Sequence, residues 1–238
     1  MRADQTVGGG PPEAAAPTPA RAIPFWSPAE IDAAIGETIL HLEHHGVLGY
    51  PTETVYGFGG SADQDGVDAL IRLKGRPPGK PFLLLIAGSE MIARMGLQLG
   101  GAAAALAARH WPGPLTLVLP GGERRVPERL RGPEGGVAVR WTPHEGLTRL
   151  IRAYGEPITS TSANRPGVPP ALSAGEIVTQ WGDAIGRGVL RVLDGGRLNA
   201  SAPSTVVDCT GRRPRVIRPG TISADVLRAT VPDLIGDA

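Results

Sequence analysis

The stretch Phe82-Leu83-Leu84-Leu85-Ile86 decides the fold, because it is apolar at every position. A short run of this kind predicts a β-strand whose two faces are both covered, as in the centre of a sheet packed between helices. Comparable runs recur along the chain and alternate with helical patterns, which predicts an α/β fold with a mixed sheet. The other expected strands are 47–50, 115–119, 137–140, 157–160, 189–193, 204–209 and 215–218.

Helices are expected between these strands. The first begins at the capping box Ser27-Pro28-Ala29-Glu30, which has proline at the first helical position, and Gly46 is expected to end it. Residues 1–24 are rich in Gly, Pro and Ala and lack apolar periodicity, so we expect a disordered leader followed by one domain over 25–238. The other expected helices are 64–74, 89–96, 101–110, 145–154, 173–181 and 223–229.

The composition excludes several classes of protein. With 238 residues, 41% hydrophobic and 20% charged, the chain has the make-up of a globular protein. The formal net charge of +1 gives no general attraction to nucleic acid, so any anion site is local. The single cysteine, Cys209, excludes an internal disulfide framework. The chain has no apolar run of membrane-spanning length and no signal-peptide core, so we expect a cytoplasmic location and no membrane partner.

A basic loop precedes the opening strand: Lys74-Gly75-Arg76-Pro77-Pro78-Gly79-Lys80-Pro81. Its prolines restrict the backbone and so lower the entropy cost of holding three cations together. This favours a site for a polyphosphate, and the alternative is a solvated basic turn. The loop is not a Walker A motif, because only three residues separate its glycines and Pro81 stands where Ser or Thr would be required.

Hydroxyl groups and arginines follow several expected strands. Thr52-Glu53-Thr54 comes after 47–50, and a run of hydroxyl residues from Thr159 to Ser162 follows Ile158. Such groups at strand ends can hydrogen-bond a ligand in an α/β sheet, although ordinary capped turns have the same composition. Arg140 and Arg218 also end expected strands, where arginine can clamp a carboxylate or phosphate or form a surface ion pair. Together these ends predict one crevice.

Two other patterns in the sequence do not favour a site. His41, His44 and His45 have helical spacing, which is one way of binding a metal, but no cysteine or carboxylate cluster completes a site. We therefore predict no protein ligand for a metal. The serines near 160 lack the Gly-x-Ser-x-Gly elbow and an identifiable base, so a serine hydrolase is not favoured.

Six segments occur in a characteristic order along the chain: 51–57, 74–76, 111–116, 137–140, 162–164 and 203–208. This order resembles that of the YrdC/Sua5 family of threonylcarbamoyl-AMP synthases, in its short form, across about residues 28–220. The resemblance implies an open, twisted sheet flanked by helices around a concave basic cavity. It also implies that L-threonine, bicarbonate and ATP react to give threonylcarbamoyl-AMP and pyrophosphate, for the t6A modification of adenosine 37 in tRNA.

The resemblance also implies roles for individual residues. Lys74 and Arg76 are expected to be catalytic, and Mg²⁺ is expected to be held through the ATP phosphates. Small-molecule substrates are the expected partners, together with transient contact with the t6A transferase machinery and with tRNA or other RNA. The L-threonine site is expected to contain Thr54, Arg140, Ser160 and Ser204. The ATP site is expected to contain Lys74, Arg76, Lys80, Ser162, Asn164 and Arg218.

The chain departs from the family pattern at three positions. Leu85 stands where many relatives have histidine, Gly136 where some have a hydroxyl residue, and Pro170 where serine is common. These departures affect peripheral contacts. Two alternatives stay open: a protein that binds double-stranded RNA, and an enzyme that transfers a carbamoyl group through an adenylate to another acceptor. The near-neutral charge and the aromatic content of 4% argue against RNA binding as the main role.

Overall fold

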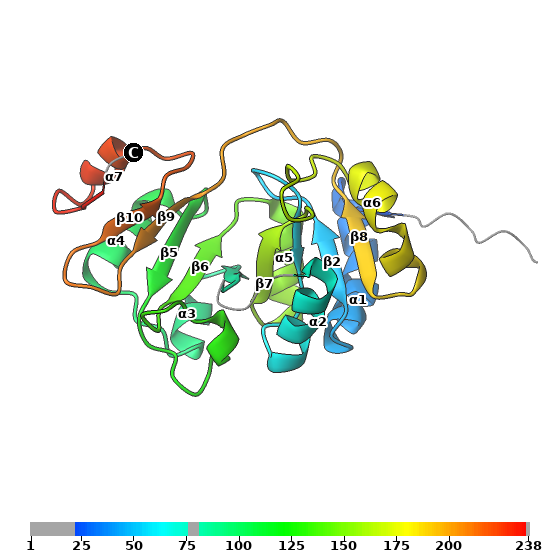
Figure 1. Ribbon diagram of the computed structural model, residues 1–238, viewed down its shortest axis with the longest axis horizontal. Helices are drawn as coiled ribbons and strands as arrows, with labels where there is room; N and C mark the ends of the chain where they lie inside the picture. Colours follow the sequence, from blue (N-terminus) through cyan, green and yellow to red (C-terminus); the bar gives the residue numbers. More distant parts are fainter. Residues whose placement is uncertain (1–21, 76–80, 237–238) are drawn as a thin grey trace, which may run out of the picture.

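The computed structural model describes residues 22–75 and 81–236, which form one mixed ten-stranded sheet with flanking helices. The strand order is β1-β8-β2-β3-β7-β4-β6-β5-β9-β10, and Figure 1 shows most of the strands side by side in one row. The strands are β1 Ile23–Pro24, β2 Val47–Tyr50, β3 Gly57–Gly59, β4 Leu83–Ile86, β5 Leu115–Leu119, β6 Val137–Trp141, β7 Ile158–Ser162, β8 Leu190–Asp194, β9 Thr205–Asp208 and β10 Arg215–Arg218.

The helices lie where the sequence predicts them, with differences at their ends. They are α1 Pro28–Glu43, α2 Gln64–Lys74, α3 Glu90–Arg94, α4 Gly101–His110, α5 Glu145–Tyr154, α6 Ala174–Gly186 and α7 Ala224–Arg228, with a 3₁₀ turn η1 at Glu128–Leu130. Both bonds of the predicted capping box at Ser27 and Glu30 are present. The predicted α/β fold with a mixed sheet is confirmed.

Two short strands were not predicted. β3 contains two glycines, and glycine disfavours strands. It nevertheless pairs with both β2 and β7, and a side chain at Gly59 would place its Cβ only 1.8 Å from the Thr159 carbonyl oxygen. The glycine is therefore required by the close approach of β7. β1 lies within the stretch expected to be disordered, which is a correction for Ile23 and Pro24; residues 1–21 of that stretch fall outside the described residues.

Two helix ends also differ from the prediction. α1 stops at Glu43, and His45 rather than Gly46 adopts the left-handed conformation, with φ of 57°. Gly46 is needed for space, because a Cβ there would lie 2.3 Å from the His41 ring. α6 runs past the expected end at 181 to Gly186, and Trp181 has non-helical torsion angles within it.

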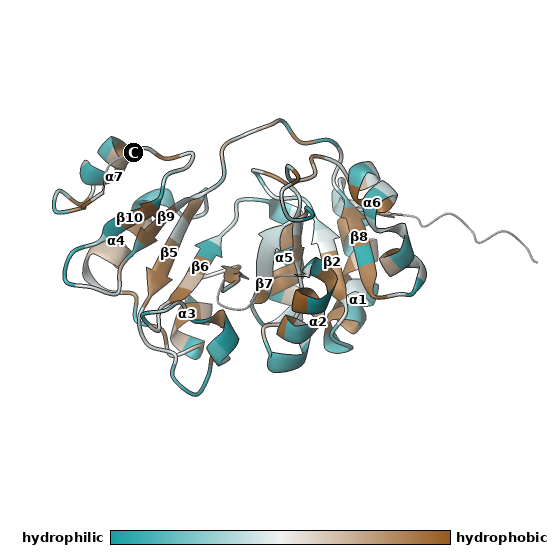
Figure 2. Cartoon of the chain, viewed as in Figure 1, coloured by the Kyte–Doolittle hydropathy of each residue, from teal (hydrophilic) through white to brown (hydrophobic). Residues whose placement is uncertain are grey.

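The core lies between the sheet and the helices. Its largest fully buried side chains include Tyr50, Tyr56, Phe25 and Phe58. Figure 2 shows apolar residues concentrated on strands such as β5 and β8, and polar residues on the outer turns of the helices. Among residues 22–75 and 81–236, no helix has the length and apolar character needed to cross a membrane.

One long connection has consequences for the site. β8 and β9 are consecutive in the chain but lie near opposite ends of the sheet. Residues 195–204 join them and arch across the top of the molecule in Figure 1. Tyr56 anchors the start of this connection: its hydroxyl donates to the Gly196 carbonyl at 2.7 Å and accepts from the Gly195 amide at 3.1 Å.

Candidate functional site

A cavity of about 840 Å³ opens between the 52–55 turn, the middle strands and the long connection. The sheet register explains its wall. Leu83 lies opposite Ser160 across β4 and β7, while Ala138 and Arg140 alternate along β6 with residues that face the other side. β5, β6 and β9 therefore present every second side chain to one common space, which is the crevice that the sequence predicts.

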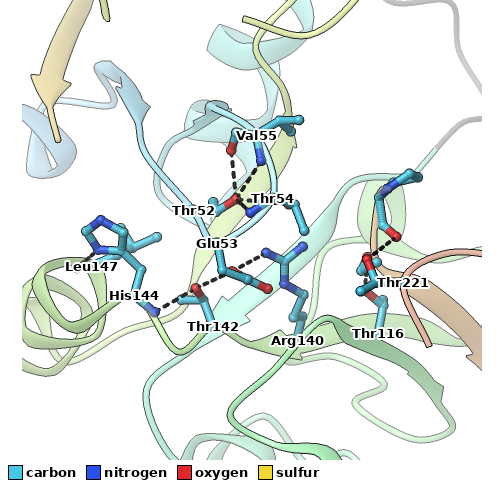
Figure 3. A network of polar contacts seen from close by, with 12 residues as sticks. Thr52, Glu53, Thr54, Val55, Thr116, Arg140, Thr142, His144, Leu147 and Thr221 are labelled. Carbon is cyan, nitrogen blue, oxygen red and sulfur yellow. Dashed lines mark hydrogen bonds and ion pairs between the residues drawn. The ribbon is translucent and has the colours of Figure 1, made fainter. Parts of the chain in front are cut away.

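The four residues predicted for L-threonine all line this cavity: Thr54, Arg140, Ser160 and Ser204. Thr54 is positioned by Thr52, whose hydroxyl accepts from the Thr54 and Val55 amides at 3.2 and 3.3 Å and donates to the Val55 carbonyl at 2.7 Å (Figure 3). The turn is thus fixed by its own hydroxyl group. Their proximity makes a common role feasible, and the role itself stays a prediction.

Arg140 is held by a carboxylate that was not predicted as part of the site. Its Nη2 donates to Glu53 Oε2 at 2.7 Å, and the Thr142 hydroxyl donates to the same oxygen at 2.8 Å (Figure 3). Arg140 Nε and Glu53 Oε1 are buried and have no hydrogen-bond partner. The sequence signal was present, since Glu53 is the only acidic residue in the turn, but no pattern indicates which cation it meets.

Lys74 links two of the predicted nucleotide-binding segments. Its Nζ donates to the Ser162 carbonyl at 2.8 Å and to Asn164 Oδ1 at 2.9 Å, and it also contacts the Asn164 carbonyl. The Ser162 hydroxyl donates to Asn164 Oδ1 at 2.6 Å. Ser162 lines the cavity, whereas Lys74 and Asn164 contact Ser162 without being part of the wall. The predicted residues Arg76 and Lys80 lie outside the described residues.

Arg218 lines the cavity from β10 and is held by Ser204. Its Nη2 donates to the Ser204 carbonyl at 2.7 Å and to the Ser204 hydroxyl at 2.9 Å. That hydroxyl is also 2.9 Å from the buried Thr116 hydroxyl, a contact that the sequence did not reveal. Burial of the head group, which removes water from around the charge, lowers the pKa of Arg218, and the charge of Arg140 lowers it further.

The cavity extends beyond the predicted residues. Its wall also includes Glu134, Asp208 and Arg215, which come from the loop before β6, from β9 and from β10. Arg215 lies 3.7 Å from Asp208 and 4.0 Å from Glu134. The described wall therefore carries charges of both signs, and the basic character of the cavity stays a prediction.

The three departures from the family pattern have different positions. Gly136 and Pro170 line the cavity. Leu85 is fully buried, does not line the cavity, and pairs with Arg140 in the β4–β6 register. Leu85 therefore lies beside Arg140 on the neighbouring strand.

The histidines of α1 have partners within the protein. His41 Nε2 lies 3.0 Å from the Val47 carbonyl, and burial lowers the pKa of His41. His45 lies 3.3 Å from Asp63. Within the described part of the chain, no group of three His, Cys, Asp or Glu residues is suited to hold a metal ion.

Comparisons with known proteins show what this chain is similar to. A family model named for Sua5, YciO and YrdC, and described as telomere recombination, matches residues 41–220. The threonylcarbamoyl-AMP synthase of Marinobacter nauticus is 37% identical over 164 residues, which cover 68% of this chain and 84% of that protein. The synthase of Pyrococcus abyssi is 36% identical over 189 residues, covering 79% of this chain, and the chain spans only 54% of its length.

A solved structure has the same fold. The crystal structure of P. abyssi Sua5 complexed with L-threonine matches with a TM-score of 0.79 and 31% sequence identity. The match covers 90% of this chain and 62% of that chain. The similarity therefore extends across almost the whole described fold.

Proposed function

The chain belongs to the Sua5/YciO/YrdC family, and on that premise we propose that it is an L-threonylcarbamoyladenylate synthase. In this role it is a nucleotidyltransferase that makes threonylcarbamoyl-AMP and pyrophosphate from L-threonine, bicarbonate and ATP. The product supplies the t6A modification of tRNA. Similarity to proteins named threonylcarbamoyl-AMP synthase, and to a structure with L-threonine, supports the proposal.

One observation carries the proposal. Arg140 and Arg218 face the same cavity, and Arg140 is near enough to lower the pKa of Arg218. Two positive charges that influence each other in this way favour a ligand that carries anionic groups between them. L-Threonine supplies a carboxylate and ATP supplies phosphates, while Thr54, Ser160 and Ser204 supply hydroxyl groups for hydrogen bonds.

The proposed reaction needs no nucleophile from the protein. The amine of L-threonine combines with bicarbonate to give a carbamate, with loss of water. A carbamate oxygen attacks the α-phosphorus of ATP, and pyrophosphate leaves. Catalysis then consists of positioning and charge stabilisation, which lysine, arginine and hydroxyl groups can provide. In this scheme Arg140 binds the carboxylate, and Lys74 and Arg218 stabilise charge on the phosphates, with Arg76 and Lys80 assigned the same role.

The proposed function also implies a metal ion, Mg²⁺, and partners that use the product. The described residues provide no cluster of metal ligands, so Mg²⁺ is proposed to enter with the ATP phosphates and no described residue is assigned to it. The adenylate then passes to the enzymes that modify tRNA, in the cytoplasm, which makes transient contact with that machinery or with tRNA part of the proposal.

The direct test supplies ATP, L-threonine and bicarbonate and measures pyrophosphate together with the adenylate. We expect pyrophosphate release that requires L-threonine and bicarbonate. Pyrophosphate release when L-threonine or bicarbonate is left out, or no pyrophosphate release with all three substrates, would contradict the proposal. Salt-dependent binding of duplex RNA without adenylate formation would support the RNA-binding alternative. Adenylate formation from carbamoyl phosphate in preference to L-threonine would support the carbamoyl-transfer alternative.

A further inference from the structure

Glu53 lies behind the arginine that is proposed to bind L-threonine. We propose that Glu53 is a positioning residue: it holds the Arg140 guanidinium in the orientation that receives the substrate carboxylate. The inference rests on the proposed function, because it takes Arg140 as the carboxylate-binding group. It assigns a role to the one residue of the 52–55 turn that does not line the cavity, although Thr52, Thr54 and Val55 all do.

The geometry places the carboxylate on the side of Arg140 away from the ligand space. Arg140 contributes to the cavity wall and Glu53 does not. A single carboxylate oxygen, Oε2, receives both the Arg140 and the Thr142 bonds, at 2.7 and 2.8 Å. One edge of the guanidinium is thereby occupied, while Arg140 Nε is buried without a partner. Within the described residues Arg140 makes no other side-chain hydrogen bond, and its Nη1 is not among the buried unpaired atoms, so Nη1 can donate to an incoming carboxylate.

The carboxylate is itself fixed by a chain of hydrogen bonds. The His144 amide donates to the Thr142 hydroxyl at 3.1 Å, and that hydroxyl donates to Glu53 (Figure 3). His144 in turn caps α5, because its Nδ1 accepts from the Leu147 amide at 3.2 Å. The position of Glu53 is thus set by the start of a helix, which is more rigid than a free side chain on a turn.

Physical chemistry gives a reason for a carboxylate here. The Arg140 side chain is 6% exposed and that of Glu53 is 18% exposed, so each charge is largely removed from water. A buried guanidinium without a counter-charge is costly, and arginine also has many rotamers to lose on binding. A fixed partner lowers both costs before the ligand arrives. Glu53 also lies between Thr52 and Thr54 in the chain, so the turn that carries the Thr54 hydroxyl is tied to Arg140 through the Glu53 side chain.

The test measures ligand affinity by calorimetry in Glu53→Gln, which keeps the shape of the side chain and removes its charge. We expect L-threonine to bind about tenfold more weakly, in the range of a hydrogen bond to a charged group, and ATP affinity to change less than about twofold. L-Threoninamide, which lacks the carboxylate, is expected to bind the unaltered and Glu53→Gln proteins equally. A general structural defect would weaken both ligands.

Three further variants complete the test. Thr142→Val, which removes one bond to Glu53, should cause a smaller loss of the same kind. Glu37→Gln is the matched control, because Glu37 pairs with Arg191 at 3.5 Å on the surface, and no effect is expected. In an Arg140→Met background, Glu53→Gln should cause no additional loss, because the two residues act through one interaction.

The outcomes separate the two proposals. Unchanged L-threonine affinity in Glu53→Gln, or an equal loss for the amide, would overturn the role of Glu53 alone. An unaltered chain that binds no L-threonine would overturn both the role of Glu53 and the proposed function. If Glu53→Gln does not fold, Thr142→Val decides the question by the same comparison of L-threonine with its amide.

Discussion

Arg140 and Arg218 line one cavity but are held in different ways. Arg140 is paired with a carboxylate at 2.7 Å, whereas the Arg218 contacts are to the carbonyl and hydroxyl oxygens of Ser204. Within the described part of the chain, no carboxylate lies within 4.0 Å of Arg218. A guanidinium with a fixed counter-charge is suited to recognising the shape of a ligand. One without a counter-charge supplies more net attraction for an anion.

Removing Arg140 should have the largest effect. Arg140→Met leaves the Glu53 carboxylate buried without its partner, so we expect the free energy of unfolding to fall by about 3–5 kcal/mol. Urea denaturation measures this change. The double variant Arg140→Met/Glu53→Gln should recover most of the loss without restoring L-threonine binding. A single variant as stable as the unaltered chain would show that the pair is not effectively buried.

The matching change at the other arginine should act on the ligand. Arg218→Met is expected to weaken ATP binding by about 2 kcal/mol, the scale of a lost charged hydrogen bond, while unfolding changes by less than about 1 kcal/mol. Calorimetry with ATP and urea denaturation give the two values. A large loss of stability with unchanged ATP affinity would show that Arg218 stabilises the fold rather than the bound ligand, which contradicts the prediction.

Ser204 provides a smaller test of how Arg218 is held. Ser204→Ala removes the hydroxyl that contacts both Arg218 and the buried Thr116 hydroxyl. We expect about 1–2 kcal/mol lower stability, because Thr116 keeps a buried polar group without that partner. In Ser204→Ala/Thr116→Val both hydroxyls are gone, and stability should partly return. Additive losses in the double variant would contradict this reading of the contact.

The smallest expected effect is the contribution of His144, on the Arg140 side, to the pH dependence of stability. Burial lowers the pKa of His144 below its ordinary value, although the Glu53 charge opposes the shift. The unfolded chain then binds a proton more readily, so the contribution of His144 is complete above about pH 6.5 and is lost as pH falls toward the lower folded pKa. Protonation also competes with the bond that His144 Nδ1 accepts from Leu147.

Unfolding measured between pH 7.5 and 5.5 checks this expectation. As the pH falls from 7.5 to 5.5, we expect the free energy of unfolding of the unaltered chain to drop by up to about 1 kcal/mol more than that of His144→Asn. Asparagine can cap a helix but does not titrate in this range. His41 also has a lowered pKa and is present in both proteins, so its contribution cancels. Parallel pH profiles would contradict the assignment to His144.

Much of the fold was predictable because periodicity is a local property. The run Phe82–Ile86 contained strand β4, and the strand-end residues Ser160 and Arg140 lie on one cavity as expected. β3 was missed because its glycines are required by the approach of β7, a contact about 100 residues away in the chain. The Glu53–Arg140 pair was missed for a similar reason, since its members are 87 residues apart. Local patterns do not identify such partners.

The long connection between β8 and β9 also bears on the order of assembly. Thr54 and Arg140 precede this connection in the chain, whereas Ser204 and Arg218 come at its end or after it. β2 must also wait for β8, which is about 140 residues away, and pairings of this range form slowly. During synthesis the residues of the Arg140 wall are therefore joined to the chain before Arg218. A protease cut within 195–204 would leave the two arginines on separate fragments.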